Sequence, residues 1–156
     1  MKSFSKFALS ATLGACGLLG LSTSAFALTT EHGSICKAYG SSTTAGVYTY
    51  ITGTFNSSGG SLGLICPVVR TIPSPAGGYS VWVQGTSGAA GGGSCAMYSY
   101  DYNNTFKGSI GTGALPAGFF SRVLTLTAAQ VPFWSSQSVY CYLPSGGGIY
   151  NVEPVQ

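Results

Sequence analysis

Short segments in which hydrophobic and polar residues alternate recur along most of the chain. At 138–143, Val139 and Cys141 fall on one side of an extended backbone, whereas Tyr140 and Tyr142 fall on the other. No stretch longer than about ten residues has the 3.6-residue periodicity of an amphipathic helix. The pattern therefore predicts an all-β protein.

Runs rich in Val, Ile, Tyr, Phe and Thr, separated by turn residues, predict eight strands and a weaker ninth. We expect them at 34–39, 47–55, 61–71, 79–85, 94–102, 119–127, 138–143 and 149–153, with the ninth at 106–110. One helical turn fits 127–131. Eight or nine short strands at this spacing predict an antiparallel β-sandwich in a single domain, either a jelly roll or an immunoglobulin-like fold.

The segment 61–71 differs from the others because both of its faces are apolar. Leu64 and Cys66 share one face, whereas Ile65 and Val69 share the other. This pattern predicts the most buried strand. Pro67 has no N–H to donate to a neighbouring strand, so it indicates a bulge or an unpaired edge at that position.

In the other strands, aliphatic and cysteine positions alternate with aromatic ones. Val47, Ile51 and Phe55 are expected opposite Tyr48 and Tyr50. If the aliphatic side is the core, the rings form an outer aromatic face of the kind that binds sugars or another protein. This candidate binding face consists of Tyr48, Tyr50, Trp82, Tyr98, Tyr100, Tyr102, Tyr140 and Tyr142.

A purely structural interpretation of the same tyrosines stays open. Tyrosine is a good strand former, and its amphipathic ring tolerates the solvated face of a sheet without a ligand. In addition, a shift of one residue in strand register would reverse every assignment of side chains to faces.

The first 27 residues have the composition of a cleavable signal peptide. Lys2 and Lys6 precede an apolar stretch at 7–21, and small residues flank Phe26 at a cleavage site after Ala27. The alternatives are a retained membrane anchor and a lipoprotein signal at Cys16. Removal of 27 of the 156 residues leaves 28–156, which is 129 residues and enough for one domain. We therefore expect a secreted or periplasmic protein that is not inserted in a membrane.

Four cysteines follow the leader, at Cys36, Cys66, Cys95 and Cys141. In an exported chain this number predicts two disulfides, and three pairings are possible. We favour the pairs nearest in sequence, 36 with 66 and 95 with 141. No pair has the two-residue spacing of a zinc knuckle, so the pattern does not indicate a metal site.

The 28–156 segment is almost free of charge. Four cations stand against three carboxylates, which leaves a net charge of +1 without a basic cluster for nucleic acid. General acid and base chemistry has few candidates, and His32 is the only histidine. We predict a protein without enzymatic activity or cofactor, and keep a hydrolase that uses His32, Asp101 and a serine as a remote alternative.

Three short motifs suggest a family. They are Cys-Pro-Val-Val-Arg at 66–70, Tyr-Cys-Tyr-Leu-Pro at 140–144 and Ile-Tyr-Asn-Val-Glu at 149–153. With these motifs the chain resembles a group of small exported bacterial proteins of unknown function. The resemblance implies an exported β-sandwich with two disulfides, and it transfers no catalytic residue.

Two main functional hypotheses follow from these observations. The first is a non-enzymatic protein with a structural or protein-binding role at the cell surface, in the periplasm or in the extracellular matrix. The alternative is a carbohydrate-binding module that uses the tyrosine and tryptophan face. The expected partner is accordingly a cell-surface protein or a glycan, and the sequence does not choose between them.

Overall fold

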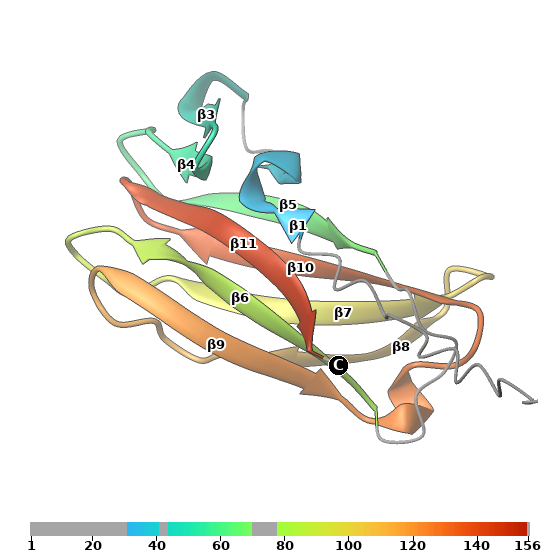
Figure 1. Cartoon of the computed structure of the whole chain (residues 1–156). Coiled ribbons are helices and arrows are strands. Elements are labelled where there is room, and N and C mark those ends of the chain that lie inside the picture. The colour runs from blue at the N-terminus through green and yellow to red at the C-terminus, as the bar shows by residue number, and fades with distance from the viewer. Residues whose placement is uncertain (1–30, 41–43, 70–77, 156) are drawn as a thin grey trace, which may run out of the picture.

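The computed structural model describes residues 31–40, 44–69 and 78–155. The expected signal peptide, Cys16 and the last two positions of the predicted strand 61–71 lie outside these residues. The described residues form two antiparallel sheets packed face to face (Figure 1). The prediction of an all-β sandwich is therefore confirmed.

Eleven strands and three short 3-10 helices make up the described residues. The strands are β1 (Glu31–His32), β2 (Lys37–Ala38), β3 (Val47–Tyr50), β4 (Gly53–Asn56), β5 (Leu62–Val68), β6 (Tyr79–Ser87), β7 (Ser94–Asp101), β8 (Phe106–Gly111), β9 (Phe119–Leu126), β10 (Ser135–Leu143) and β11 (Gly147–Val155). The helices are η1 (Gly33–Ile35), η2 (Thr44–Gly46) and η3 (Ala128–Gln130). The expected ninth strand and the single helical turn correspond to β8 and η3.

The strand order is that of a jelly roll. Sheet A has the order β3-β4-β11-β6-β9, with β1 also paired to β11, and sheet B has the order β2-β5-β10-β7-β8. The eight strands from β4 to β11 thus divide into the sets 4-11-6-9 and 5-10-7-8, which is the double-sheet jelly-roll arrangement. Of the two predicted alternatives, the jelly roll is confirmed and the immunoglobulin-like order is wrong.

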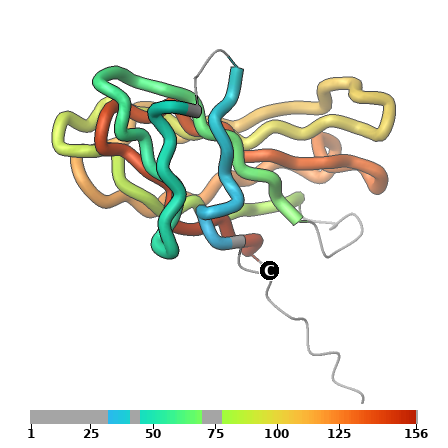
Figure 2. Tube along the Cα trace, turned by 90° about the horizontal axis from the view of Figure 1, so that it is seen from above, coloured from blue at the N-terminus to red at the C-terminus, as the bar shows by residue number. Residues whose placement is uncertain are grey.

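The segment 31–40 connects the two sheets at one side of the sandwich. Its β1 pairs with β11 in sheet A, and its β2 pairs with β5 in sheet B (Figure 2). The sequence pattern predicts one strand at 34–39, but η1 occupies 33–35. This turn lets the chain change sheets, because the Gly33 Cα lies against the β11 backbone where a Cβ would not fit.

The core lies between the two sheets and follows the predicted alternation. Buried aliphatic side chains from both inner faces meet there, including Leu64, Val81, Val83, Met97, Leu124, Val139 and Val152. Each fully buried side chain of this size contributes about 1.5 to 3 kcal/mol through removal of apolar surface from water. In β6, β7 and β10, the residues that alternate with these buried side chains lie on the outer face, as the sequence predicts.

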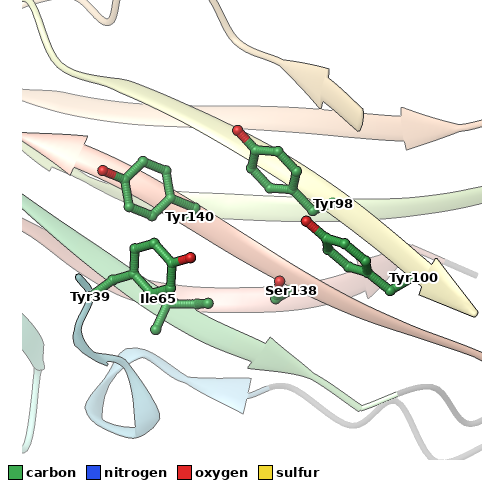
Figure 3. A pocket seen from close by; sticks show the side chains of 6 residues that line it. All are labelled: Tyr39, Ile65, Tyr98, Tyr100, Ser138 and Tyr140. Carbon is green, nitrogen blue, oxygen red and sulfur yellow. The ribbon is translucent and has the colours of Figure 1, made fainter. Parts of the chain in front are cut away.

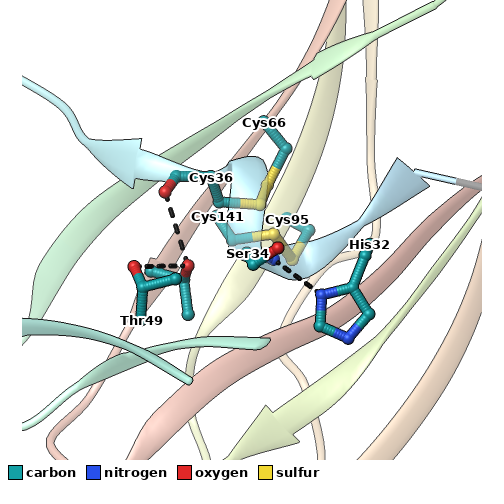
Figure 4. Close-up of a disulfide and its surroundings, with 8 residues drawn as sticks. His32, Ser34, Cys36, Thr49, Cys66, Cys95 and Cys141 are labelled. Atoms are coloured by element: carbon teal, nitrogen blue, oxygen red, sulfur yellow. Dashed lines mark hydrogen bonds between the residues drawn. A yellow bond between two sulfur atoms is a disulfide. The ribbon is translucent and has the colours of Figure 1, made fainter. Parts of the chain in front are cut away.

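Two disulfides lie on the inner face of sheet B, and their pairing is the one favoured from the sequence. They join Cys36 to Cys66 and Cys95 to Cys141 (Figure 4). Cys141 lies directly opposite Cys95 in the ladder of β10 and β7, and all four cysteines are buried. The bonds therefore fasten neighbouring strands within one sheet and do not bridge the two sheets.

The expected strand 47–55 is wrong as a single element. It folds into the hairpin of β3 and β4, and Ile51 at the turn is 93% exposed. Phe55 is then paired with Tyr48 and shares its outer face, contrary to the predicted alternation. Gly53 is the physical reason that the segment folds into a hairpin. Its positive φ of 141° and its close approach to the β11 backbone suit a residue without a side chain.

β5 is largely buried, as expected for the segment 61–71, but its two apolar faces are not buried equally. In β5, Ile65 is only half-buried, and Val69 after the strand is exposed. Pro67 pairs with Ser138 of β10 but lies beyond the short ladder that β5 forms with β2. Its missing N–H therefore coincides with an unpaired edge, as predicted.

We expect the Cys95–Cys141 bond to be a major contributor to stability. The bond closes a loop of 46 residues, and replacement of both cysteines by alanine should lower the free energy of unfolding by about 4 kcal/mol on the chain-entropy account. Urea denaturation followed by circular dichroism measures the change. The corresponding double variant of Cys36 and Cys66, with a separation of 30, should lose slightly less. A loss below about 1 kcal/mol in both would contradict the entropic account.

Candidate functional site

The outer face of sheet B carries a groove lined mainly by tyrosines. Tyr98 and Tyr100 project from β7, Ser138 and Tyr140 project from β10, and Tyr39 directly follows β2 (Figure 3). Together with Ile65 of β5, these residues surround a hollow of about 380 Å³. Strands far apart in the sequence thus contribute to a single concave surface.

One wall of the groove is the pair of Tyr39 and Tyr140. Their ring centres are 5.4 Å apart, and the rings meet edge to face at 71°, which is a favourable geometry for aromatic pairs. The Tyr140 ring lies against the Cα of Gly63, where any side chain would collide with it. The Gly63 carbonyl also accepts a hydrogen bond from the Tyr39 N–H at 3.0 Å. Gly63 therefore positions both rings.

The other wall is formed by Tyr98 and Tyr100 of β7. Phe106 of the neighbouring strand β8 supports both rings, with centre distances of 6.5 Å to Tyr98 and 5.7 Å to Tyr100. Tyr100 is 37% exposed, and Tyr39 in the opposite wall is 54% exposed. Both walls therefore present ring surface and phenolic hydroxyl groups to solvent.

A second hollow of about 350 Å³ continues the groove along sheet B. Its lining shares Ile65, Tyr100 and Ser138 with the first hollow, and it adds Ser136 and Lys37. Among the residues that line the two hollows, Lys37 is the only one with a permanent charge. The surface is thus a combination of rings and hydroxyl groups with little net charge.

The structure divides the predicted aromatic face between the two outer surfaces of the sandwich. Tyr98, Tyr100, Tyr140 and Tyr142 belong to sheet B, with Tyr102 directly after β7, whereas Tyr48, Tyr50 and Trp82 belong to sheet A. Tyr39 and Phe106 are not among the residues of the predicted face. Tyr39 follows Cys36 at an odd spacing, and this places it on the outer face, so the signal for it was present in the alternation.

On sheet A, five rings form a continuous row across the outer face. Tyr48, Tyr50, Phe55, Tyr150 and Phe119 contact one another in that order, with centre distances between 5.7 and 6.4 Å. Tyr150 is the extra residue of a bulge in β11, which explains why the regular alternation does not predict its position. The predicted binding face lacks Tyr150 because of this bulge and Phe55 because of the hairpin of β3 and β4; it also lacks Phe119, the first residue of β9.

The groups considered for a hydrolase lie in different parts of the fold. His32 belongs to β1 of sheet A, and its Nδ1 accepts a hydrogen bond from the Ser34 N–H at 3.2 Å (Figure 4). Asp101 ends β7 of sheet B, where its Oδ1 accepts hydrogen bonds from the Asn103 and Thr105 N–H groups, both at 2.9 Å. The hydrogen bonds of both residues therefore serve local turns.

The Asp101 carboxylate is stabilised in its charged form. The N–H groups of Thr105 and Asn103 and the Lys107 ammonium, 3.4 Å from Oδ2, hold the pKa of Asp101 below its ordinary value. Within the described ranges, no group of three or more His, Cys, Asp or Glu side chains is arranged to hold a metal ion. No helix in that part of the chain is long and apolar enough to cross a membrane.

Comparisons with known proteins identify similar folds but no family. No family model and no curated protein matches the chain. One similar solved structure is TmCBM61 in complex with β-1,4-galactotriose, with a TM-score of 0.47 and 15% identity over 80% of this chain and 90% of that chain. Another is the enzymatically active domain of tailspike protein 4 of bacteriophage CBA120, with a TM-score of 0.45 and 18% identity over 65% of this chain and 14% of that chain. At these identities the likeness concerns the fold alone.

We expect Tyr140 to ionise at higher pH than an ordinary tyrosine. Burial raises its pKa above the usual 10.0, and the neighbouring Tyr142, Tyr98 and Tyr39 raise it further. The folded protein therefore keeps the Tyr140 proton longer than the unfolded chain does. This contribution to stability is complete below pH 10 and is lost as the pH rises through the raised pKa.

An ultraviolet titration of tyrosinate absorbance measures this effect. Tyr140→Phe should remove a step above pH 10, whereas Tyr102→Phe, which removes a tyrosine that is 75% exposed, should leave that step in place. A titration in which Tyr140→Phe removes a step at lower pH would show that the ring is more solvated than its packing indicates.

Proposed function

We propose that the protein is an exported glycan-binding module and that the groove on sheet B is its binding site. The observation that carries this proposal is the hollow of about 380 Å³ between the walls formed by Tyr39 with Tyr140 and by Tyr98 with Tyr100. Binding sites for small molecules are concave and combine apolar surface with a few convergent polar groups. The groove has both properties.

The chemistry of the lining favours a neutral sugar. A pyranose ring has apolar C–H surfaces that pack on aromatic faces, and its hydroxyl groups exchange hydrogen bonds with phenolic and serine oxygens. Tyr100 and Ser138 offer both kinds of contact within one hollow. An anionic ligand is less well matched, because Lys37 in the adjoining hollow is the single cation among the described residues of the lining.

The expected export of the protein also supports a glycan-binding role. Disulfides persist in secreted and periplasmic proteins and are rare in the reducing cytosol. This protein has two, both buried. Together with the leader at 1–27, they support a location where polysaccharides of cell walls, capsules or matrices are accessible.

Affinity electrophoresis in gels that contain galactan, xylan, glucomannan or hydroxyethyl cellulose tests the proposal. We expect at least one of these neutral polysaccharides to retard the protein. Tyr100→Ala and Tyr39→Ala should each weaken that binding roughly tenfold, as expected for the loss of an aromatic anchor in an interface.

Tyr48→Ala is the matched control, because Tyr48 is about as exposed as Tyr39 but lies on sheet A. Its binding should equal that of the unmodified protein. If a broad glycan array shows no binding, or if the Tyr100 and Tyr39 variants bind unchanged, the glycan proposal is wrong. A structural or protein-binding role then stands in its place.

A further inference from the structure

The groove on sheet B does not end at Tyr100. The last paired residues of β10 and β7 are Ser135 and Asp101, which lie opposite each other. Trp134 directly precedes β10 and Tyr102 directly follows β7. Their side chains together line a third hollow of about 350 Å³. The three hollows thus follow one another along the same two strands.

The third hollow lies at the end of the row of outward side chains on β10 and β7. Ser135 and Gln137 point inward, since the Gln137 side-chain amide donates to the Ser135 hydroxyl at 2.8 Å and to the buried Ser99 at 3.2 Å. Ser136 and Ser138 point outward and line the groove. Trp134 and Tyr102 are turn residues directly beyond the ends of β10 and β7, so the hollow that they line adjoins this outward row.

Trp134 and Tyr102 are among the most exposed aromatic side chains of the described residues, at 69% and 75%. Trp134 contacts Phe133 edge to face, with ring centres 4.6 Å apart, and this contact limits the rotation of the Trp134 side chain. A large, restrained and exposed ring at the end of a groove is suited to stacking against a ligand.

We infer that Trp134 and Tyr102 form a second aromatic subsite, so that the site accommodates an extended neutral oligosaccharide and not a single sugar. This inference rests on the proposed function. From Trp134, directly before β10, to Tyr140 the chain makes six residue steps, or about 20 Å at 3.3 Å per residue. A span of this length accommodates several sugar units along the strand direction.

The distribution of side chains along this span supports an extended ligand. Rings stand at one end in Tyr39 and Tyr140 and at the other in Trp134 and Tyr102, whereas Ser136 and Ser138 lie between them. The terminal units of an oligosaccharide can thus stack on rings while the central units exchange hydrogen bonds with hydroxyl groups.

Calorimetric titration with galacto-, cello-, xylo- and manno-oligosaccharides of one to six units tests the inference. For the series that binds, affinity should increase with length until the ligand reaches Trp134. Trp134→Ala should then weaken the longest ligands about tenfold and leave the shortest unchanged. Trp134→Phe should retain part of the gain with length, because it keeps an aromatic ring.

Trp82→Ala is the control, since Trp82 is the other tryptophan of the protein and lies on the outer face of sheet A. It should leave the affinity unchanged at every length. Thermal unfolding should be the same for both tryptophan variants and the unmodified protein, which excludes a general loss of folding.

The possible failures of the two proposals are distinguishable. If Tyr100→Ala weakens binding but affinity does not depend on ligand length, or if Trp134→Ala changes all lengths equally or none, the second subsite is wrong and the glycan-binding groove stands. If the unmodified protein binds neither the oligosaccharides nor the polysaccharides, both proposals are wrong.

Discussion

The register of β10 against its two neighbours is the constraint on which both the core and the groove depend. The disulfide that joins Cys141 to Cys95 fastens two residues that lie directly opposite each other in the ladder. Because the side chains of a strand alternate between faces, this one pairing determines the direction of every side chain in β10. Val139 is thereby placed in the core and Tyr140 in the groove.

Through the jelly-roll topology, the register of β10 also positions residues that are distant from it in the sequence. It places β10 between β5 and β7, so that residues from three widely separated parts of the chain share one outer surface. The Cys36–Cys66 bond extends the covalent connection to the start of β2, and Tyr39 follows directly after that strand. All four cysteines face inward, hence the bonds that stabilise sheet B do not compete with the groove for surface.

Local patterns predict most of this fold, and pairing between distant strands accounts for what they do not predict. The alternation in β7 and β10 correctly assigns Tyr98 and Tyr140 to the outer face, because each strand is regular over its whole length. It fails at 47–55, where Gly53 closes a hairpin within an apolar run, and at Tyr150, which is the extra residue of a bulge. The separation of the aromatic residues onto two sheets follows from strand order, which no single segment of the sequence encodes.

The contrast between the two aromatic surfaces explains why sheet B is the better candidate for a binding site. On sheet A, neighbouring rings stack on one another: Tyr48 on Tyr50, and Phe119 on Tyr150. On sheet B, the rings pair within each wall, and the two walls stay apart with Ser138 between them. Ring surface that is already stacked within the protein gains less from a ligand than ring surface that faces an open hollow. The same residue type therefore stabilises the fold on one sheet and leaves a site for a ligand on the other.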